Sequence, residues 1–125
     1  AGSFLVPPSR SDARVVLQQL QDVLVVPMPD PLSVEFFNEL NLNLLQTLHQ
    51  SLAKGVILDM SGVELLDATD FTQLHRIWQT STLMGSRLVL AGLQPGVAAT
   101  LTMLNVDDSW TTPALSVEHA MEKLR

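Results

Sequence analysis

Short apolar runs alternate with longer amphipathic segments along this chain, and this alternation constrains its fold more than any other feature. The runs at 23–26, 56–58 and 88–90 consist of Val, Leu and Ile, which is typical of strands covered on both faces. Between them apolar residues recur at three- and four-residue steps, the period of a helical face. Strands that alternate with helices need crossover connections, so the sequence predicts an α/β fold.

The first part of the chain has the signals of a tail followed by strands. Residues 1–12, with their prolines, serines and glycine, are predicted to form an irregular arm or an expression tail before a single domain over 13–125. Residues 15–17 and 23–26 are predicted to form a hairpin or two short strands, separated by 18–22. The prolines that follow should end the second strand, because proline cannot donate to a ladder.

A long helix is predicted next. We expect Asp30 to cap it, Pro31 to take its first position and Lys54-Gly55 to close it. Its apolar face comprises Phe36, Phe37, Leu40, Leu44, Leu45, Leu48 and Leu52. A stripe of this kind predicts a helix that packs along the sheet.

The rest of the chain continues the alternation. A second helix is predicted from the region of Asp67 to Gly85, and its buried face contains Phe71, Leu74, Ile77 or Trp78, and Ser81. We then expect a strand at 87–91, a helix from Pro95, a small edge strand at 109–112 and a helix capped by Ser116.

Composition narrows the possible functions. The net charge is −6 and the Lys and Arg residues are scattered, so the chain lacks the basic stripe that nucleic acid or an anionic membrane would require. The absence of cysteine excludes disulfides, zinc–thiolate sites and thiol catalysis. No membrane-length apolar run or signal peptide is seen, so we expect a cytoplasmic protein. The charged fraction of 16% indicates either a surface that meets a protein partner or one rich in uncharged polar residues.

Groups for enzymatic chemistry are sparse. The stretch 92–96 lacks the lysine and spacing of a phosphate-binding loop and is interpreted as a tight turn. His49, His75 and His119 lie on three different predicted helices without metal-ligand spacing, and His75 is the one that could face a partner. No serine stands beside a histidine, as a nucleophile and its base would require. We therefore expect no catalytic residues, no metal and no cofactor.

Four carboxylates, Asp59, Glu64, Asp67 and Asp70, cluster between the third predicted strand and the second helix. Such groups can perform acid–base chemistry when one is buried. Asp67 and Asp70, however, stand three residues apart at a helix start, where carboxylates bind free N–H groups and favour the positive end of the helix dipole. We interpret this pair as a cap.

Two stretches resemble a known family. Gly-Val-Ile-Leu-Asp-Met-Ser-Gly-Val-Glu-Leu-Leu-Asp, at 55–67, resembles the strand and loop of STAS domains, the bacterial anti-sigma-factor antagonists. Leu-Met-Gly at 83–85 and Gly-Leu-Gln-Pro-Gly-Val-Ala-Ala-Thr-Leu at 92–101 resemble the RsbS-type members and the STAS halves of RsbR-type members, the scaffold components of the stressosome. The resemblance covers 13–124. It implies a single STAS domain, with a mixed β-sheet and helices packed mainly on one face.

The resemblance also implies a switch site. In this family the residue after the aspartate that matches Asp67 is a serine or threonine that a switch serine kinase phosphorylates, which changes partner binding. Here that position is Ala68, which has no hydroxyl. The chain is then a member with a fixed unphosphorylated state, a serine-to-alanine variant, or a member in which Thr69 has taken the role. The implied partner surface is Asp67, Ala68, Thr69 and Asp70, with His75 and Arg76 further along the helix.

The function implied by the resemblance is that of a non-enzymatic signalling regulator. It would bind a switch serine kinase and other STAS proteins, as a homo- or hetero-oligomer, and neither nucleic acid nor membrane. The alternative is a STAS module that binds a small ligand, such as a nucleotide or lipid, in a signalling or transport system. A small acid–base enzyme using Asp59 and Asp67 is a more remote alternative.

Overall fold

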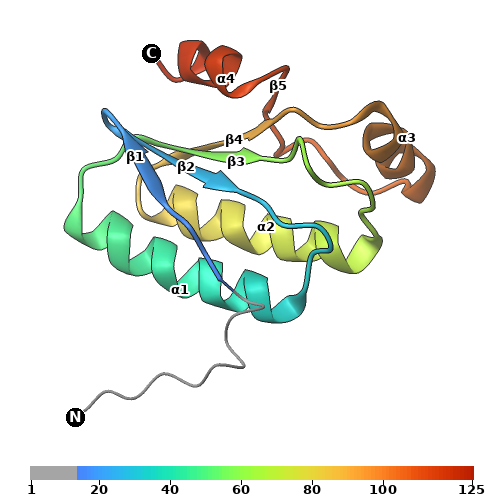
Figure 1. Cartoon of the computed structure of the whole chain (residues 1–125), viewed down its shortest axis with the longest axis horizontal. Helices are drawn as coiled ribbons and strands as arrows, with labels where there is room; N and C mark the ends of the chain where they lie inside the picture. Colours follow the sequence, from blue (N-terminus) through green and yellow to red (C-terminus); the bar gives the residue numbers. More distant parts are fainter. Residues whose placement is uncertain (1–13) are drawn as a thin grey trace.

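A five-stranded mixed sheet in the order β1-β2-β3-β4-β5 organises the chain (Figure 1). The computed structural model describes residues 14–125, so the arm predicted over 1–12 lies outside the described residues. The strands are β1 (Gln18–Leu20), β2 (Val23–Pro27), β3 (Gly55–Asp59), β4 (Arg87–Ala91) and β5 (Pro113–Ala114). β1 is antiparallel to β2, and the other pairs are parallel. The prediction of an α/β fold with a mixed sheet is confirmed.

Within residues 14–125, four helices pack against this sheet or beyond its edge. α1 (Val34–Gln50) and α2 (Ala68–Leu83) cover one face, α4 (Val117–Lys123) covers the other, and α3 (Pro95–Leu104) lies beyond the edge at which the parallel strands end (Figure 1). The larger core, between the sheet and α1 and α2, includes Phe36, Phe37, Leu40, Leu44, Val56, Leu58, Leu74 and Ile77. A smaller core under α4 includes Val23, Val25, Ile57, Val89 and Leu124. The expected packing of helices mainly on one face is confirmed, with α4 as the exception.

The first strand lies further along the chain than the sequence predicts. β1 spans Gln18–Leu20, inside the 18–22 stretch that the sequence predicts to separate the two strands, whereas Val15 and Leu17 pack against the larger core before the strand begins. Leu20 pairs with Val23, so the connection is Gln21-Asp22 alone, and Gln21 has φ 56°. Left-handed turn positions are usually occupied by Gly, Asn or Asp, so a glutamine there carried no turn signal.

Both ends of α1 also differ from the prediction. The helix begins three residues after Pro31, because the Ser33 hydroxyl accepts a hydrogen bond from the Phe36 N–H at 3.1 Å and caps it. It ends at Gln50, and Lys54-Gly55 does not close it. Gly55 instead begins β3, where a Cβ would lie 2.6 Å from Leu124 Cδ1. This glycine lets α4 approach the sheet closely.

The C-terminal half agrees with the prediction except at its edge strand. The Asp67 cap, the buried face of α2, the turn at Gly85 with φ 84°, β4 and the Ser116 cap of α4 are confirmed. The edge strand is Pro113–Ala114, not 109–112. Residues 109–111 do not extend alongside β4, because the Thr111 N–H turns back to the Asp108 carbonyl at 3.0 Å and Trp110 packs against the larger core. Pairing with β4 begins at Thr112, whose carbonyl accepts a hydrogen bond from the Leu90 N–H at 2.9 Å. Within residues 14–125, no helix combines the length and apolarity that a membrane span requires.

Neighbouring leucines of α1 provide a test of this packing. Leu44 is 0% exposed and Leu45 is 42% exposed, although the sequence placed both on the buried face. We expect Leu44→Ala to lower the free energy of unfolding by about 2–5 kcal/mol and Leu45→Ala by less than about 1 kcal/mol. Urea unfolding measures both variants. Equal losses of stability in the two variants would contradict the observed orientation of α1, which buries Leu44 and exposes Leu45.

Candidate functional site

The start of α2 is a reciprocal cap built from two aspartates. Asp67 Oδ1 accepts a hydrogen bond from the Asp70 N–H at 2.8 Å, and Asp70 Oδ2 accepts one from the Asp67 N–H at 3.2 Å. The first helical bond, from the Phe71 N–H to the Asp67 carbonyl, is 3.0 Å long. Each carboxylate therefore has a structural role, as the spacing predicted.

The two residues between these aspartates are exposed. Ala68 and Thr69 occupy the first two positions of α2. Among the described residues no acceptor is found for their N–H groups, which is usual in the first turn of a helix. Thr72, one turn further on, uses its hydroxyl to bond the Ala68 carbonyl at 3.0 Å. This turn thus presents a methyl group, a hydroxyl group and two free donors to solvent.

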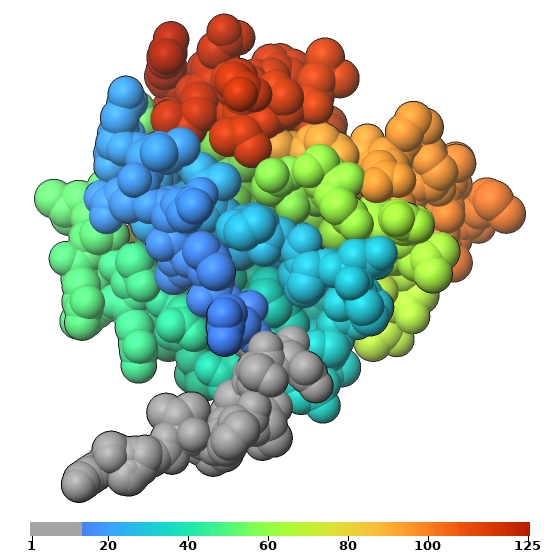
Figure 2. All heavy atoms as spheres, in the orientation of Figure 1, coloured from blue at the N-terminus to red at the C-terminus, as the bar shows by residue number. Residues whose placement is uncertain are grey.

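The loop that leads to this cap is held by its neighbours. Met28 N–H donates to the Asp59 carbonyl at 3.0 Å, and Met60 N–H to the Ala91 carbonyl at 2.8 Å. The Gln94 side chain donates to the Ser61 carbonyl at 2.8 Å. Figure 2 shows the green β3–α2 segment at the surface between the cyan β2–α1 segment and the orange start of α3. The α2 start is therefore presented on a fixed support.

Arg76 lies on the side of α2 that meets α1. It is two turns beyond Thr69, so both share one flank of the helix. Its guanidinium donates to Gln73 Oε1 at 2.8 Å and lies 3.4 Å from Asn38 Oδ1 of α1. The Thr80 hydroxyl also hydrogen-bonds Asn41 of α1, at 2.5 Å. The exposed surface beyond Thr69 is thus shared by both helices.

His75 lies on the opposite flank, two turns beyond Ala68, and is half-buried. Its ring stacks on Trp78, with centroids 5.4 Å apart and planes 13° apart, and lies 5.1 Å from the Trp110 ring. Trp110 also contacts Phe71, at 5.2 Å. This aromatic cluster fastens the α3–β5 connection to α2. The structure therefore brings Asp67, Ala68, Thr69 and Asp70 together, and places His75 and Arg76 on opposite flanks below them.

Two carboxyl groups near α2 have shifted pKa values. Burial raises the pKa of Asp70 above its ordinary value, and the negative charge of Asp67 acts in the same direction against a lowering backbone hydrogen bond. Hydrogen bonds from Ser109, and then the charge of His75, lower the pKa of Asp107. Asp107 lies in the connection that follows α3, three residues before Trp110.

The remaining candidates have structural roles or are solvated. Asp59 Oδ1 accepts hydrogen bonds from the Ser61 N–H at 3.1 Å and the Ser61 hydroxyl at 2.7 Å, so it shapes the loop. Glu64 and His49 are exposed. His119 Nδ1 accepts a hydrogen bond from the Leu115 N–H at 3.0 Å. Residues 14–125 contain no cluster of His, Asp and Glu side chains suited to a metal ion.

Sequence reasoning missed one prominent member of this surface. Leu65, two residues before the cap, is 80% exposed, whereas Leu66 is 4% exposed. In an irregular loop no periodicity tells which of two adjacent leucines faces the core. The sequence offers one signal here: two adjacent leucines before a helix cap seldom both face the core. Leu65 adds an apolar side chain to the acidic start of α2.

The chain belongs to the STAS domain family, whose model matches residues 14–120. This match confirms the family that the 55–67 and 92–101 stretches indicated.

Comparison with individual proteins supports the RsbS-like branch. The chain is 29% identical to a Moorella thermoacetica RsbS variant in which a serine is glutamate, with a TM-score of 0.76 over 89% of this chain and 94% of that one. A stressosome structure, called a signal integration and transduction hub, gives 28% identity and a TM-score of 0.75 over 87% and 95%. The RsbT co-antagonist protein RsbRA of Bacillus subtilis is 24% identical over 102 residues, 75% of this chain but only 37% of RsbRA.

The Asp67 cap has a measurable energy. Asp67→Ala removes the acceptor of the Asp70 N–H, so we expect it to lower the free energy of unfolding by about 0.5–2 kcal/mol. Asp67→Asn keeps an oxygen acceptor and should remain close to the unchanged protein. Denaturant unfolding tests both. An unchanged midpoint in Asp67→Ala would show that the bond contributes nothing to stability.

The raised pKa of Asp70 predicts a pH dependence of opposite sign to that of most carboxylates. The folded protein binds this proton more tightly than the unfolded chain does, so the Asp70 contribution to stability falls as pH rises from the ordinary value of 3.8 through the folded-state pKa. The free energy of unfolding of the unchanged protein, minus that of Asp70→Asn, should therefore decrease between about pH 3 and about pH 7. A difference that rises or stays level would contradict this.

Proposed function

We propose that this chain is a non-enzymatic signalling regulator of the anti-sigma-factor-antagonist and stressosome type, and that the start of α2 is its partner-binding surface. The partners are a switch serine kinase and other STAS proteins. The observation that carries the proposal is the intact Asp67–Asp70 cap, which presents residue 68 to solvent within an RsbS-like STAS fold.

The chemistry of this turn suits a phosphoacceptor at position 68. A phosphate there would meet the free N–H groups of the first turn and the positive end of the α2 dipole. It would add about −1.5 to −2 charges beside Asp67 and Asp70. A docked partner would meet this charge directly, whereas the cap, formed by other atoms, would persist.

Because Ala68 cannot be phosphorylated, this chain would always resemble the unphosphorylated form of such a regulator. A methyl group at the first helical position leaves the cap intact and cannot accept a phosphate. The kinase is therefore expected to bind this chain without modifying residue 68. Thr69 is the nearest hydroxyl, and it points along the flank that leads to Arg76 rather than along the flank of Ala68.

Restoring the hydroxyl tests the proposal. With a switch serine kinase and ATP, Ala68→Ser should take up phosphate at residue 68, and the unchanged chain should take up none. Mass spectrometry of the intact protein and its peptides measures this. The double variant Ala68→Ser, Thr69→Ala is the matched control and should be modified equally. Modification of Thr69 in both the unchanged chain and Ala68→Ser would assign the switch to Thr69 instead.

Binding can be measured separately from phosphorylation. Light scattering after size exclusion should show a complex between the unchanged chain and the kinase. Thr69→Arg places a bulky cation on the exposed first turn and should abolish the complex, whereas Gln46→Arg, on the exposed part of α1, should not. A complex that persists in Thr69→Arg, or one that is lost equally in Gln46→Arg, would contradict a binding surface at the start of α2.

A further inference from the structure

The outer edge of β4 is covered only along its second half. β5 pairs with Leu90 and Ala91 and does not reach the residues before them. The Leu90 N–H donates to the Thr112 carbonyl at 2.9 Å, and the Gly92 N–H donates to the Ala114 carbonyl at 2.9 Å. The first half of β4 therefore has β3 on one side and, within residues 14–125, no strand on the other.

Leu88 has an unpaired N–H and an unpaired carbonyl at this open edge. Backbone groups of successive strand residues point to opposite sides. The Arg87 N–H bonds the Lys54 carbonyl on the β3 side at 3.0 Å, and the Leu90 N–H bonds on the β5 side, so Leu88 also faces the β5 side. The described part of the chain offers neither Leu88 group a hydrogen-bond partner there, although the residue is only 4% exposed. Backbone groups in such a position normally have a partner, so a ligand that supplies one acceptor and one donor would complete this edge.

A cleft of about 360 Å³ is lined by this part of β4. The other lining residues come from the end of α2, the turn after it and the chain that enters β5: Trp78, Thr82, Gly85, Ser86 and Thr112. The Ser86 hydroxyl donates to the Ala53 carbonyl at 2.6 Å, and the Ser86 N–H donates to the Ser81 carbonyl at 2.8 Å. Hydrogen bonds that fix a site before binding reduce the entropy lost on association. The cleft is thus organised without a ligand.

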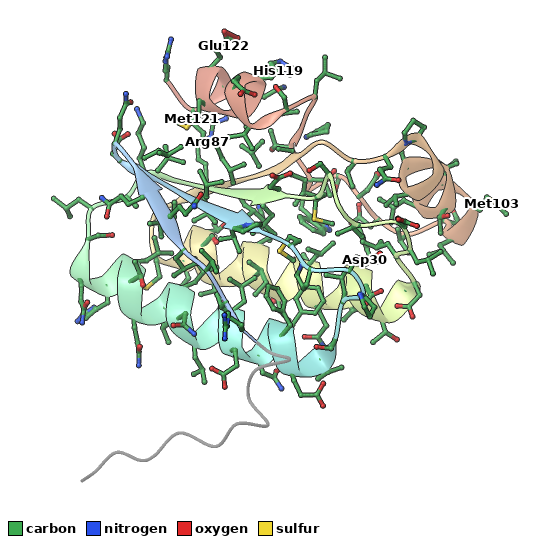
Figure 3. All side chains as sticks on the ribbon, in the orientation of Figure 1. Asp30, Arg87, Met103, His119, Met121 and Glu122 are labelled. Atoms are coloured by element: carbon green, nitrogen blue, oxygen red, sulfur yellow. The ribbon has the colours of Figure 1, made fainter. Side chains whose placement is uncertain are left out.

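The two faces of the sheet differ in chemistry beside this edge. The Leu88 side chain lies in the larger core, on the face that α2 covers with Trp78 and Thr82. Arg87 points to the opposite face, where its guanidinium donates to the Lys123 carbonyl of α4 at 3.2 Å (Figure 3). Arg87 is exposed and forms no salt bridge within residues 14–125. Because laterally adjacent residues of neighbouring strands share a face, an added strand would place an apolar side chain toward Trp78 and a carboxylate beside Arg87.

We propose that the open edge of β4 binds an extended peptide of a protein partner, in which apolar and acidic residues alternate. The peptide would donate one N–H to the Leu88 carbonyl and accept the Leu88 N–H with one carbonyl, which adds a strand to the sheet. Its carboxylates would lie beside Arg87, and its apolar side chains beside Trp78. A simple anion would satisfy Arg87 but has no N–H group for the Leu88 carbonyl, so the backbone pair favours a peptide.

This site is separate from the proposed kinase-binding surface and does not rest on it. The cleft lies at the end of α2, whereas the kinase surface is at its start, and the helix has 16 residues. At 1.5 Å per residue the two sites are about 24 Å apart. A peptide bound at β4 would therefore leave the Asp67–Asp70 turn accessible, and the domain could hold two partners at once.

Amide hydrogen exchange of the chain alone, followed by NMR, tests the open edge. The Leu88 N–H should exchange about tenfold or more faster than those of Val89 and Leu90, which are paired within the sheet. Equal protection of all three would show that Leu88 already has a partner and would overturn the proposal.

A synthetic peptide tests binding. Acetyl-Glu-Val-Glu-Val-Glu-amide should shift the Leu88 amide resonance saturably and slow its exchange. The same peptide with every peptide nitrogen methylated keeps its side chains but has no N–H to donate, and a peptide with Lys in place of Glu reverses the charge. Both should bind about tenfold or more weakly. No effect of the acidic peptide on Leu88 at about 1 mM, or equal binding of the methylated peptide, would contradict an added strand.

Matched variants locate the site. Thr82→Glu and Arg87→Glu place a carboxylate at the cleft, and each should weaken binding of the acidic peptide by about tenfold or more. Gln46→Glu adds the same charge on the exposed part of α1 and should leave peptide binding unchanged. Circular dichroism melting checks that each variant is folded. Equal weakening in Gln46→Glu, or peptide-induced shifts at the start of α2 instead of at Leu88, would refute the site at β4.

Discussion

The burial of β3 on both faces is the constraint on which the rest of the structure depends. Val56 and Leu58 face the larger core and Ile57 faces the smaller one, and none of the three is exposed. A strand buried in this way must lie in the middle of the sheet, with parallel partners on each side. The carboxyl ends of β2, β3 and β4 then meet at one edge, so the chain leaving β3 reaches the start of α2 among the neighbouring loops.

At that edge the cap and the proposed phosphoacceptor position use different atoms. The cap is complete with the two carboxylates and two N–H groups of Asp67 and Asp70. Alanine at position 68 removes nothing from it, and alanine has the highest helix propensity. A STAS domain can therefore lack a hydroxyl at this position without any cost in stability. The same separation explains how a charge added there could change binding without unfolding the domain.

The parallel arrangement also brings carboxylates together at one edge of the sheet. α1 and α2 both begin near the edge at which the parallel strands end (Figure 1), so their positive dipole ends lie together and favour carboxylates such as Glu35 and Asp70. The opposite ends of these two helices do not show a matching set of cations, because the last turn of α2 contains no basic residue and that of α1 contains His49 alone.

The sequence by itself determined the order of elements, the buried central strands and the Asp67–Asp70 cap, because each depends on short-range periodicity or on atoms three residues apart. It could not reveal which of Leu44 and Leu45 is buried, nor that Gly55 serves the approach of Leu124 rather than the end of a helix. Only the tertiary structure decided that Trp110 packs against the His75 ring instead of joining a strand. These features depend on residues far apart in the chain, whose proximity no local pattern encodes.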